Sequence, residues 1–315
     1  MDRSAQATHA EEDDHPGHGQ LGERDLANRG SRSRQEGTAY NGHFGCTCYH
    51  PLFCFNHFGD LEVCLLREGN VHSAKDWKSV LDPIVARYRD RELRRYFRGD
   101  AAFANPAIYE YLEAERFSYA IRLPANEILS REIEHLLTRP VGRPPKAPVV
   151  RYHDFQYQAA KWSRQRGLIA KAEWHRGELF PRVGFIVTNL TRPAKAVVRF
   201  YNHRGTAEQM IKEGKNAVKW TRLSCHDFAD NKVRLQLFDL AYNLGNFFRQ
   251  VALPKSIRHW TMTTLREKVI KIGVKVVSHA RYIIFQMAEV AVSSELFASI
   301  LRRIGKLRLL MAQSG

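Results

Sequence analysis

Between residues 49 and 123, segments with the two-residue period of a strand alternate with segments that have the longer period of a helix. Two strand-like segments flank a turn at 57–60 and predict a hairpin. They are followed by an amphipathic helix at 73–88, a short strand, a helix at 106–115 and a last strand at 118–123. This order predicts an α/β core.

The composition of the chain divides it into four segments. Residues 1–36 are polar, without a run of three apolar residues, and predict a disordered leader. Residues 37–123 hold the first part of the α/β core. Residues 124–193 combine a proline-bearing linker with short strand-like stretches and predict a β-rich insertion. Helical periodicity returns in residues 194–315, which we expect to form the second part of the core and a C-terminal region.

The charge of the chain indicates a polyanionic partner. Over 315 residues, 49 Lys and Arg outnumber 33 Asp and Glu, which gives a formal net charge of +16. Nucleic acid is the first expectation and an anionic membrane surface the second. The long apolar stretch at 282–304 contains charged residues, so we expect no membrane span. An odd number of cysteines and no secretory signal favour a cytoplasmic protein with reduced thiols.

The most informative segment runs from Tyr201 to Lys215. In a continuous helix, at about 100° per residue, Tyr201, Arg204, Glu208 and Lys215 project within an arc of roughly 60°. One interpretation is a solvated helix face with an ion pair, because Arg204 and Glu208 are four positions apart. The other is a functional site, and the residues alone do not decide between them.

The spacing of these four residues resembles a known signature. Tyr, two residues, Arg, three residues, Glu, six residues and Lys is the pattern of DDE transposases of bacterial insertion sequences, in the group called transposase DDE domain, group one. Blocks such as Arg98-Gly99-Asp100 and Gly177-Glu178-Leu179-Phe180-Pro181 are also similar to that family, and the resemblance extends from about residue 35 to the end. It implies an α/β fold with an RNase H-like mixed sheet, flanked by helices, and a β-rich insertion between the second and third acidic residues.

The resemblance also implies a metal-dependent reaction on DNA. Asp100 and Glu208 would be the second and third catalytic acids and would bind two Mg²⁺ or Mn²⁺ ions, which lie about 3.5 to 4 Å apart in sites of this kind. Carboxylate oxygens are the ligands that such hard cations prefer. Considered alone, Asp100 is equally typical of a turn or of a helix cap.

The same resemblance implies a role in DNA binding for further residues. Arg204 and Lys215 would hold phosphates, Tyr201 would position a phosphate through its hydroxyl, and Lys212 is grouped with them. In the insertion, Trp174 and Trp162 are candidates for stacking on an unstacked base, with core packing as the alternative. The implied partners are the inverted repeats of the transposon and target DNA, with a possible homodimer and no small-molecule substrate, at the nucleoid.

The sequence departs from the family at the first catalytic acid. The family places it at the end of a first strand, a few residues before the equivalent of residues 35–37, but residues 28–34 contain no carboxylate and no strand pattern. Asp14 and Asp25 lie further upstream in a polar segment. We therefore expect an N-terminally truncated transposase that lacks the first strand, leaves its neighbours unpaired and is inactive. The alternative is a transposase remnant that acts only as a basic DNA-binding protein.

Overall fold

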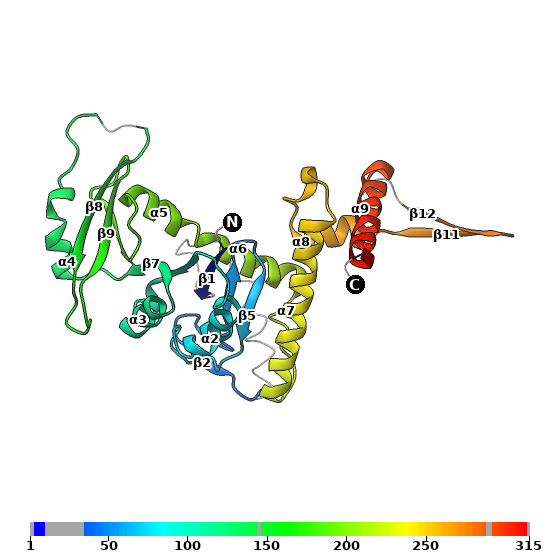
Figure 1. The fold of residues 1–315 in the computed structure, drawn as a ribbon, viewed down its shortest axis with the longest axis horizontal. Helices are drawn as coiled ribbons and strands as arrows, with labels where there is room; N and C mark the ends of the chain where they lie inside the picture. Colours follow the sequence, from blue (N-terminus) through cyan, green and yellow to red (C-terminus); the bar gives the residue numbers. More distant parts are fainter. Residues whose placement is uncertain (1–2, 10–34, 144–145, 288–291, 314–315) are drawn as a thin grey trace. The chain divides into compact units, whose positions relative to one another are not determined.

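The computed structural model describes residues 3–9, 35–143, 146–287 and 292–313 (Figure 1). The chain forms two compact units, Met1–Gln209 and Met210–Gly315, and each is described by itself.

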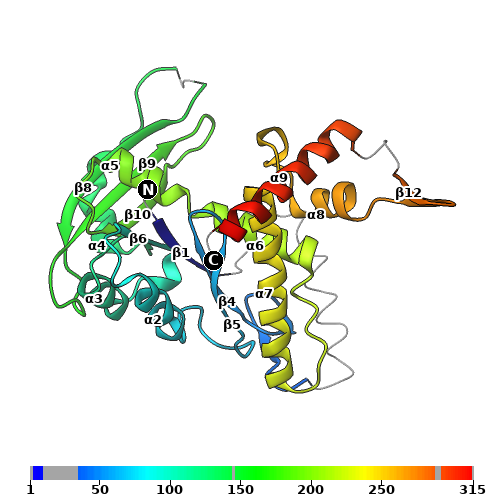
Figure 2. The same ribbon diagram turned by 45° about the vertical axis from the view of Figure 1, so that its right-hand side comes forward.

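The first unit is built on one eight-stranded sheet with the strand order β5-β4-β1-β6-β7-β10-β9-β8 (Figures 1 and 2). β1, β6 and β7 are parallel to one another, and β4 is antiparallel to β1 and to β5. The bounds of the strands are β1 (Arg3–His9), β4 (Leu52–Asn56), β5 (Leu61–Leu65), β6 (Arg95–Gly99), β7 (Phe117–Leu123), β8 (Val149–Tyr157), β9 (Arg166–Trp174) and β10 (Arg182–Thr188). This is the mixed sheet of an RNase H-like fold, extended by three strands, so the predicted fold class is confirmed.

Helices and a small hairpin complete the first unit. The helices are α2 (Trp77–Tyr88), α3 (Pro106–Ala114), α4 (Glu127–Glu132), α5 (Ala194–Asn202) and the start of α6 (Gly205–Glu213), with short 3-10 turns η1 (Ala101–Phe103) and η2 (Glu134–Leu136), and the hairpin joins β2 (Ala39–Asn41) to β3 (Cys46–Cys48). α3 begins where the sequence predicts it. The Asn105 side chain accepts a hydrogen bond from the Ala107 N–H at 3.0 Å, and proline follows at the first helical position.

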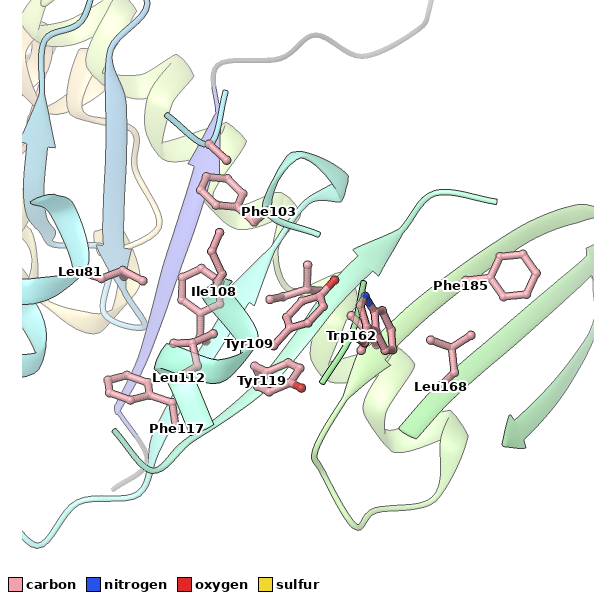
Figure 3. Packing of buried hydrophobic residues seen from close by; sticks show 14 of the residues in the cluster. Leu81, Phe103, Ile108, Tyr109, Leu112, Phe117, Tyr119, Trp162, Leu168 and Phe185 are labelled. Atoms are coloured by element: carbon pink, nitrogen blue, oxygen red, sulfur yellow. The ribbon is translucent and has the colours of Figure 1, made fainter. Parts of the chain in front are cut away.

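Helices pack on both faces of the sheet because successive side chains of a strand point to opposite faces. On β7, Tyr119 and Ile121 belong to the large core under α2 and α3, whereas Ala120 belongs to a second cluster with Val197 and Val198 of α5. Figure 3 shows the large core, where Phe103, Ile108, Leu112 and Phe117 pack around Tyr109 and Tyr119. The sheet is therefore buried on both sides near β6 and β7.

The leader differs from the sequence-based expectation. Residues 3–9 were expected to lack secondary structure, and they form β1 between β4 and β6. The N–H and C=O groups of β1 pair with both neighbours, for example Thr8 with Phe53 and Gln6 with Arg98. Backbone pairing needs no apolar pattern, and two strand edges facing each other favour any segment that can fill the gap. The expectations that the first strand is absent and that its neighbouring strands are left unpaired are therefore wrong.

The predicted β-rich insertion joins the same sheet. β10 pairs antiparallel with β7, and β9 continues the ladder to β8. The three strands lie within residues 124–193, where the sequence contains the short strand-like stretches. The insertion therefore extends the core sheet through a continuous set of backbone hydrogen bonds.

The second unit is mainly helical. It contains α7 (Phe228–Val251), α8 (Met262–Leu265), α9 (Ser294–Gln313), the hairpin of β11 (Val274–His279) and β12 (Tyr282–Met287), a 3-10 turn η4 (Lys255–Ile257), and π-helical turns η3 (Gly214–Val218) and η5 (Arg266–Ile270). The two long helices lie in residues 194–315, where the sequence shows helical periodicity. No helix among the described residues is long and apolar enough to cross a bilayer.

Candidate active site

Asp100 follows the last residue of β6 and caps the 3-10 turn η1. Its Oδ1 accepts a hydrogen bond from the Ala102 N–H at 2.9 Å, and the residue is only 7% exposed. The capping role that the sequence left open is thus present. Because the aspartate follows a strand that is paired on both sides, its backbone position is rigid.

The predicted continuous helix through Tyr201 and Lys215 is broken. α5 ends at Asn202, α6 begins at Gly205, and a turn with an Arg204 N–H to Tyr201 C=O bond of 2.8 Å separates them. Asn, His and Gly have low helix propensity, which explains the break at 202–205. The four signature residues therefore do not share one helix face.

The turn pairs the Arg204 guanidinium with Glu208, and the charge of Asp100 also acts on it. Arg204 Nη2 lies 2.6 Å from Glu208 Oε1, in an ion pair that is only partly exposed. Burial alone would lower the pKa of Arg204, but the negative field of Tyr201, Glu208 and Asp100 outweighs it and raises that pKa. Asp100 and Glu208, far apart in sequence, are thus both close enough to act on one cation.

Tyr201 and an arginine of β7 belong to the same cluster. Burial and the charge of Asp100 raise the pKa of the Tyr201 hydroxyl, against the opposing effect of Arg204 and Arg122. Arg122 is exposed and follows Ile121, which pairs with Gly99 of β6. No sequence motif singled out Arg122, although its place at the end of a strand parallel to β6 puts it at the same sheet edge as Asp100.

A buried arginine holds α5 against β6. Arg98 donates from Nη1 to the Phe200 C=O at 3.0 Å, and its guanidinium lies 4.8 Å from the centre of the Phe200 ring. Burial lowers the pKa of Arg98 to about 10, so it remains cationic at neutral pH. Arg98 fixes the end of α5, and with it Tyr201, next to the strand that carries Asp100.

The donor atoms of the site are of the type that a hard divalent cation prefers. Asp100 and Glu208 offer carboxylate oxygens, which Mg²⁺ and Mn²⁺ prefer. Within the described part of the chain, no three His, Cys, Asp or Glu residues are grouped as metal ligands. In this structure the Arg204 guanidinium supplies the positive charge that pairs with Glu208, and the charge of Asp100 acts on the same guanidinium.

The tryptophans proposed for base stacking pack in the interior instead. Trp174 and Trp162 are each only 7% exposed. The indole N–H of Trp174 donates to the Leu136 C=O at 3.4 Å, and Trp162 packs edge-on against Tyr109 at 5.5 Å between ring centres. Core packing, the alternative left open by the sequence, accounts for both residues.

An exposed aromatic residue lies at the tip of the insertion. Phe180, in the loop between β9 and β10, is 80% exposed and its neighbour Leu179 is 74% exposed. The loop turns at Gly177, whose φ of 88° favours glycine. The sequence block that includes Phe180 carried the family resemblance, and a turn glycine followed by two large apolar residues was the signal for an exposed tip.

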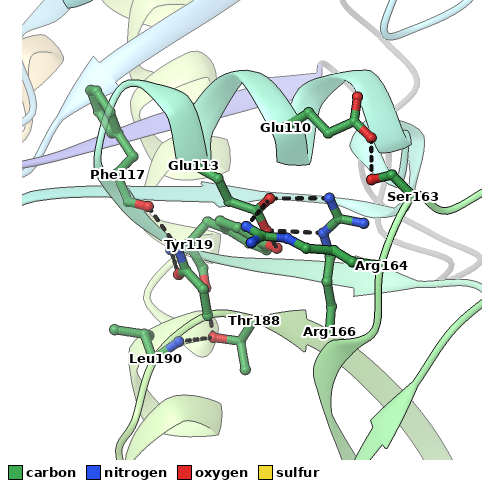
Figure 4. A network of polar contacts seen from close by, with 10 residues as sticks. Glu110, Glu113, Phe117, Tyr119, Ser163, Arg164, Arg166, Thr188 and Leu190 are labelled. Carbon is green, nitrogen blue, oxygen red and sulfur yellow. Dashed lines mark hydrogen bonds and ion pairs between the residues drawn. The ribbon is translucent and has the colours of Figure 1, made fainter.

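A buried ion-pair network anchors the insertion to the core (Figure 4). Arg166 of β9 binds Glu113 of α3 in a bidentate pair, with Nε to Oε1 at 2.9 Å and Nη2 to Oε2 at 3.0 Å. Arg164 and the Tyr119 hydroxyl bind the same carboxylate at 2.6 and 2.8 Å. Burial would raise the pKa of Glu113, but hydrogen bonds from Arg166, Arg164 and Tyr119 lower it.

The remaining predicted DNA-binding residues belong to the second unit. Lys212 is exposed in the last turn of α6, and Lys215 is half-buried in the π-helical turn η3.

The sequence model of the family "Transposase DDE domain group 1" matches residues 27–309. The chain belongs to this transposase family. The family assignment made from the signature residues is thereby confirmed, and family members of this kind usually depend on a divalent metal. No curated protein matches the chain significantly.

Among solved structures, the chain of this DDE transposase is similar to a chain in the cryo-EM structure of the piggyBac transposase synaptic complex with hairpin DNA. The identity is 10% and the TM-score is 0.46. The match covers 79% of this chain and 47% of the other, so this chain spans about half the length of that transposase.

Proposed function

We propose that the site performs DNA strand cleavage and strand transfer, with Asp100 and Glu208 as its second and third catalytic carboxylates. The observation that supports this function is the Arg204 guanidinium, which pairs with Glu208 at 2.6 Å and whose pKa the charge of Asp100 also raises. Two carboxylates that act on the same cation are more typical of a site for divalent metal ions. A helix cap at Asp100 and an unrelated surface ion pair at Glu208 would not need to share a cation.

Each residue of the site has a distinct task in this proposal. Bound metal ions would activate the attacking water or 3′-hydroxyl and stabilise the charge on the phosphate. Asp100 and Glu208 would hold those ions, Glu208 after releasing Arg204. The freed Arg204 would bind a phosphate oxygen in a bidentate manner, and the Tyr201 hydroxyl would position the same phosphate.

The DNA partner is proposed on the charge of the chain. A net charge of +16 favours binding to phosphates, and the exposed Arg122 adds a cation next to Asp100. Lys212 and Lys215 are proposed as further phosphate contacts. The exposed Phe180, in place of the buried Trp174, offers a flat apolar surface for an unstacked base. Two copies would act on the two inverted repeats of a transposon of the insertion-sequence type, in a bacterial cytoplasm.

We also infer that the chain as written does not catalyse strand transfer. The family pattern requires the first acid at the end of the first strand, a few residues before the equivalent of residues 35–37, and no carboxylate occurs at residues 28–34. The strand that fills this place in the sheet, β1, instead ends at His9. Asp14 and Asp25 lie outside the described residues. A two-metal site with one carboxylate absent loses a ligand and part of the negative charge that holds two dications together. The sequence at 28–34 therefore favours a second candidate function, a basic DNA-binding protein without catalysis.

A cleavage assay distinguishes the two functions. Purified chain is incubated with DNA that carries the element's inverted repeats and with Mg²⁺ or Mn²⁺, and nicked and joined products are resolved on a sequencing gel. We expect no product. Product that disappears in Asp100→Asn and in Glu208→Gln would refute the inferred inactivity and support the site. Loss of that product in Asp14→Asn or Asp25→Asn would then identify the first acid.

The salt dependence of DNA binding tests the role of the basic residues. Log affinity should fall steeply with log salt, and Arg204→Ala combined with Lys215→Ala should reduce the slope by about one to two phosphate contacts. Arg89→Ala, which removes an exposed arginine at the end of α2, is the matched control. An affinity that does not depend on salt would contradict binding through phosphates.

A further inference from the structure

One face of α7 is apolar and exposed along four turns. Five large side chains recur at alternating spacings of four and three residues. They are Val233 at 61% exposure, Leu237 at 61%, Leu240 at 57%, Leu244 at 59% and Phe247 at 53%. We call these five residues the α7 stripe. A mean spacing of 3.5 residues is that of a coiled-coil seam, and it is maintained over about 21 Å of helix.

The opposite face of α7 is packed and hydrogen-bonded within its own unit. Leu235, Tyr242 and Asn246 are fully buried, and the Tyr242 ring packs on Trp220 at 5.3 Å between centres. Asn231 is buried and exchanges hydrogen bonds of 2.9 and 3.1 Å with the backbone of Cys225. The helix is therefore held in place by these contacts, and the α7 stripe is not needed to form it.

The exposed area of the stripe is large for a monomer. Five side chains that are more than half exposed present about 500 Å² of apolar surface, which is near the upper end of the largest patches on monomeric proteins. Two such stripes facing each other would bury about 1,000 Å² in total, the lower limit for a specific protein interface.

The residues beside the stripe favour a second copy of the chain over other partners. Gln236, Asn243 and Gln250, which follow one flank of the stripe, are uncharged, so two copies meet without charge repulsion along most of the seam. Cations flank the stripe only at its N-terminal end, at Lys232 and Arg234, so there is no row of cations along it for a DNA backbone or for an anionic membrane surface. The seam ends at Asp230, the next position in the same spacing, which limits its length to about two heptads.

We infer that the α7 stripe is the surface through which two copies of this chain associate, each inserting its leucines between those of the other. The inference deepens the pairing of two copies proposed above by naming its surface, and it does not depend on catalysis. A stripe packed against its own copy forms an isologous interface, which closes a dimer and leaves no free apolar edge.

Sedimentation equilibrium tests this inference without DNA or metal, at protein concentrations from about 1 to 100 μM. The wild-type chain should be a dimer in that range. Leu240→Glu with Leu244→Glu should weaken association at least about 100-fold and leave a monomer, because four carboxylates would be buried in the seam. The far-UV circular dichroism and melting midpoint should remain close to wild type, since both leucines are exposed in the monomer.

Ile128→Glu is the matched control, since it introduces the same charge at a side chain of α4 that is 63% exposed. It should leave the dimer intact. A wild-type chain that remains monomeric at about 100 μM would overturn the inference, and so would equal weakening by the control and the stripe variant. A dimer that depends on the stripe but does not cut DNA would contradict only the proposed catalysis.

Discussion

The two units of the molecule differ in how far their large apolar side chains are buried. In the first unit Phe97, Leu112 and Tyr119 are fully buried, and even the charged Arg166 lies inside with its partner. The second unit has about a third of the chain, yet it holds 14 of the 20 exposed large hydrophobic side chains among the described residues. The first unit completes its own core, whereas the second retains apolar surface suited to another molecule.

The largest expected difference between the units is in their ion pairs. Arg166→Met should lower the free energy of unfolding by about 3 to 5 kcal/mol, because it breaks the buried bidentate pair and leaves the largely buried Glu113 with only the exposed Arg164 and the Tyr119 hydroxyl as partners. Arg249→Met removes the partner of Glu213 in the second unit, where both side chains are more exposed, and should cost about 1 to 2 kcal/mol. Urea unfolding measures both values. Equal costs would show that the two units bury charge to the same extent.

Truncation of a leucine in each unit gives the next largest contrast. Leu112→Ala removes a fully buried side chain of α3 and should cost about 3 kcal/mol, including the cavity that it leaves. Leu244→Ala changes an exposed position of the α7 stripe and should cost less than about 0.5 kcal/mol in the monomer. Thermal unfolding at low concentration provides the comparison. A cost above about 2 kcal/mol for Leu244→Ala would mean that this side chain is covered within the monomer.

A glycine of the second unit tests whether that unit is loosely packed throughout. A Cβ atom at Gly214 would lie 2.2 Å from the buried indole of Trp220. Gly214→Ala should therefore cost about 2 kcal/mol, because the ring must shift. Gly273→Ala is the control, since nothing lies within 4 Å of its Cβ position. A neutral Gly214→Ala would indicate that the interior of the second unit is as adaptable as its surface.

The smallest effect concerns acid stability in the first unit. Burial and the charge of Arg67 lower the pKa of His50 from 6.5 to about 4, with smaller contributions from His43 and His72. The unfolded chain therefore binds a proton between pH 6.5 and 4 that the folded chain does not, and the free energy of unfolding should fall as the pH falls through this range.

Two histidine substitutions, one as the test and one as the control, check this pH dependence. His50→Gln should flatten the slope of unfolding free energy against pH, whereas His226→Gln, at an exposed side chain, should leave it unchanged. An unchanged slope in His50→Gln would assign the acid sensitivity to other groups.

Elements with local signals were predictable from the sequence. The hairpin of β4 and β5 has a turn at Gly59 with a φ of 86°, and α3 begins at an Asn-Pro pair. The strands of the insertion follow from their two-residue period. In each case the residues that determine the element are close together in the chain, so a short segment of sequence is sufficient to predict it.

Elements that depend on distant partners were not predictable in the same way. β1 forms because two strands from elsewhere in the chain provide hydrogen-bonding edges. Residues 3–9 contain no sequence pattern that predicts this strand. The burial of Trp174 depends on Leu136. For the candidate site, the spacing selects Asp100, Arg204 and Glu208, but the contributions of Arg98 and Arg122 arise only from the folded sheet, and the metal-binding role of the acids stays a prediction.

The central place of β1 has a consequence for how the chain folds. Its parallel pairing with β6 joins residues 3–6 to residues 95–98 and closes a loop of roughly ninety residues, which carries a large entropic cost before any contact is gained. The β4–β5 hairpin and α3 need only local closure. We therefore expect the sheet to assemble from its two halves, with the insertion of β1 as the late and slow step that joins them.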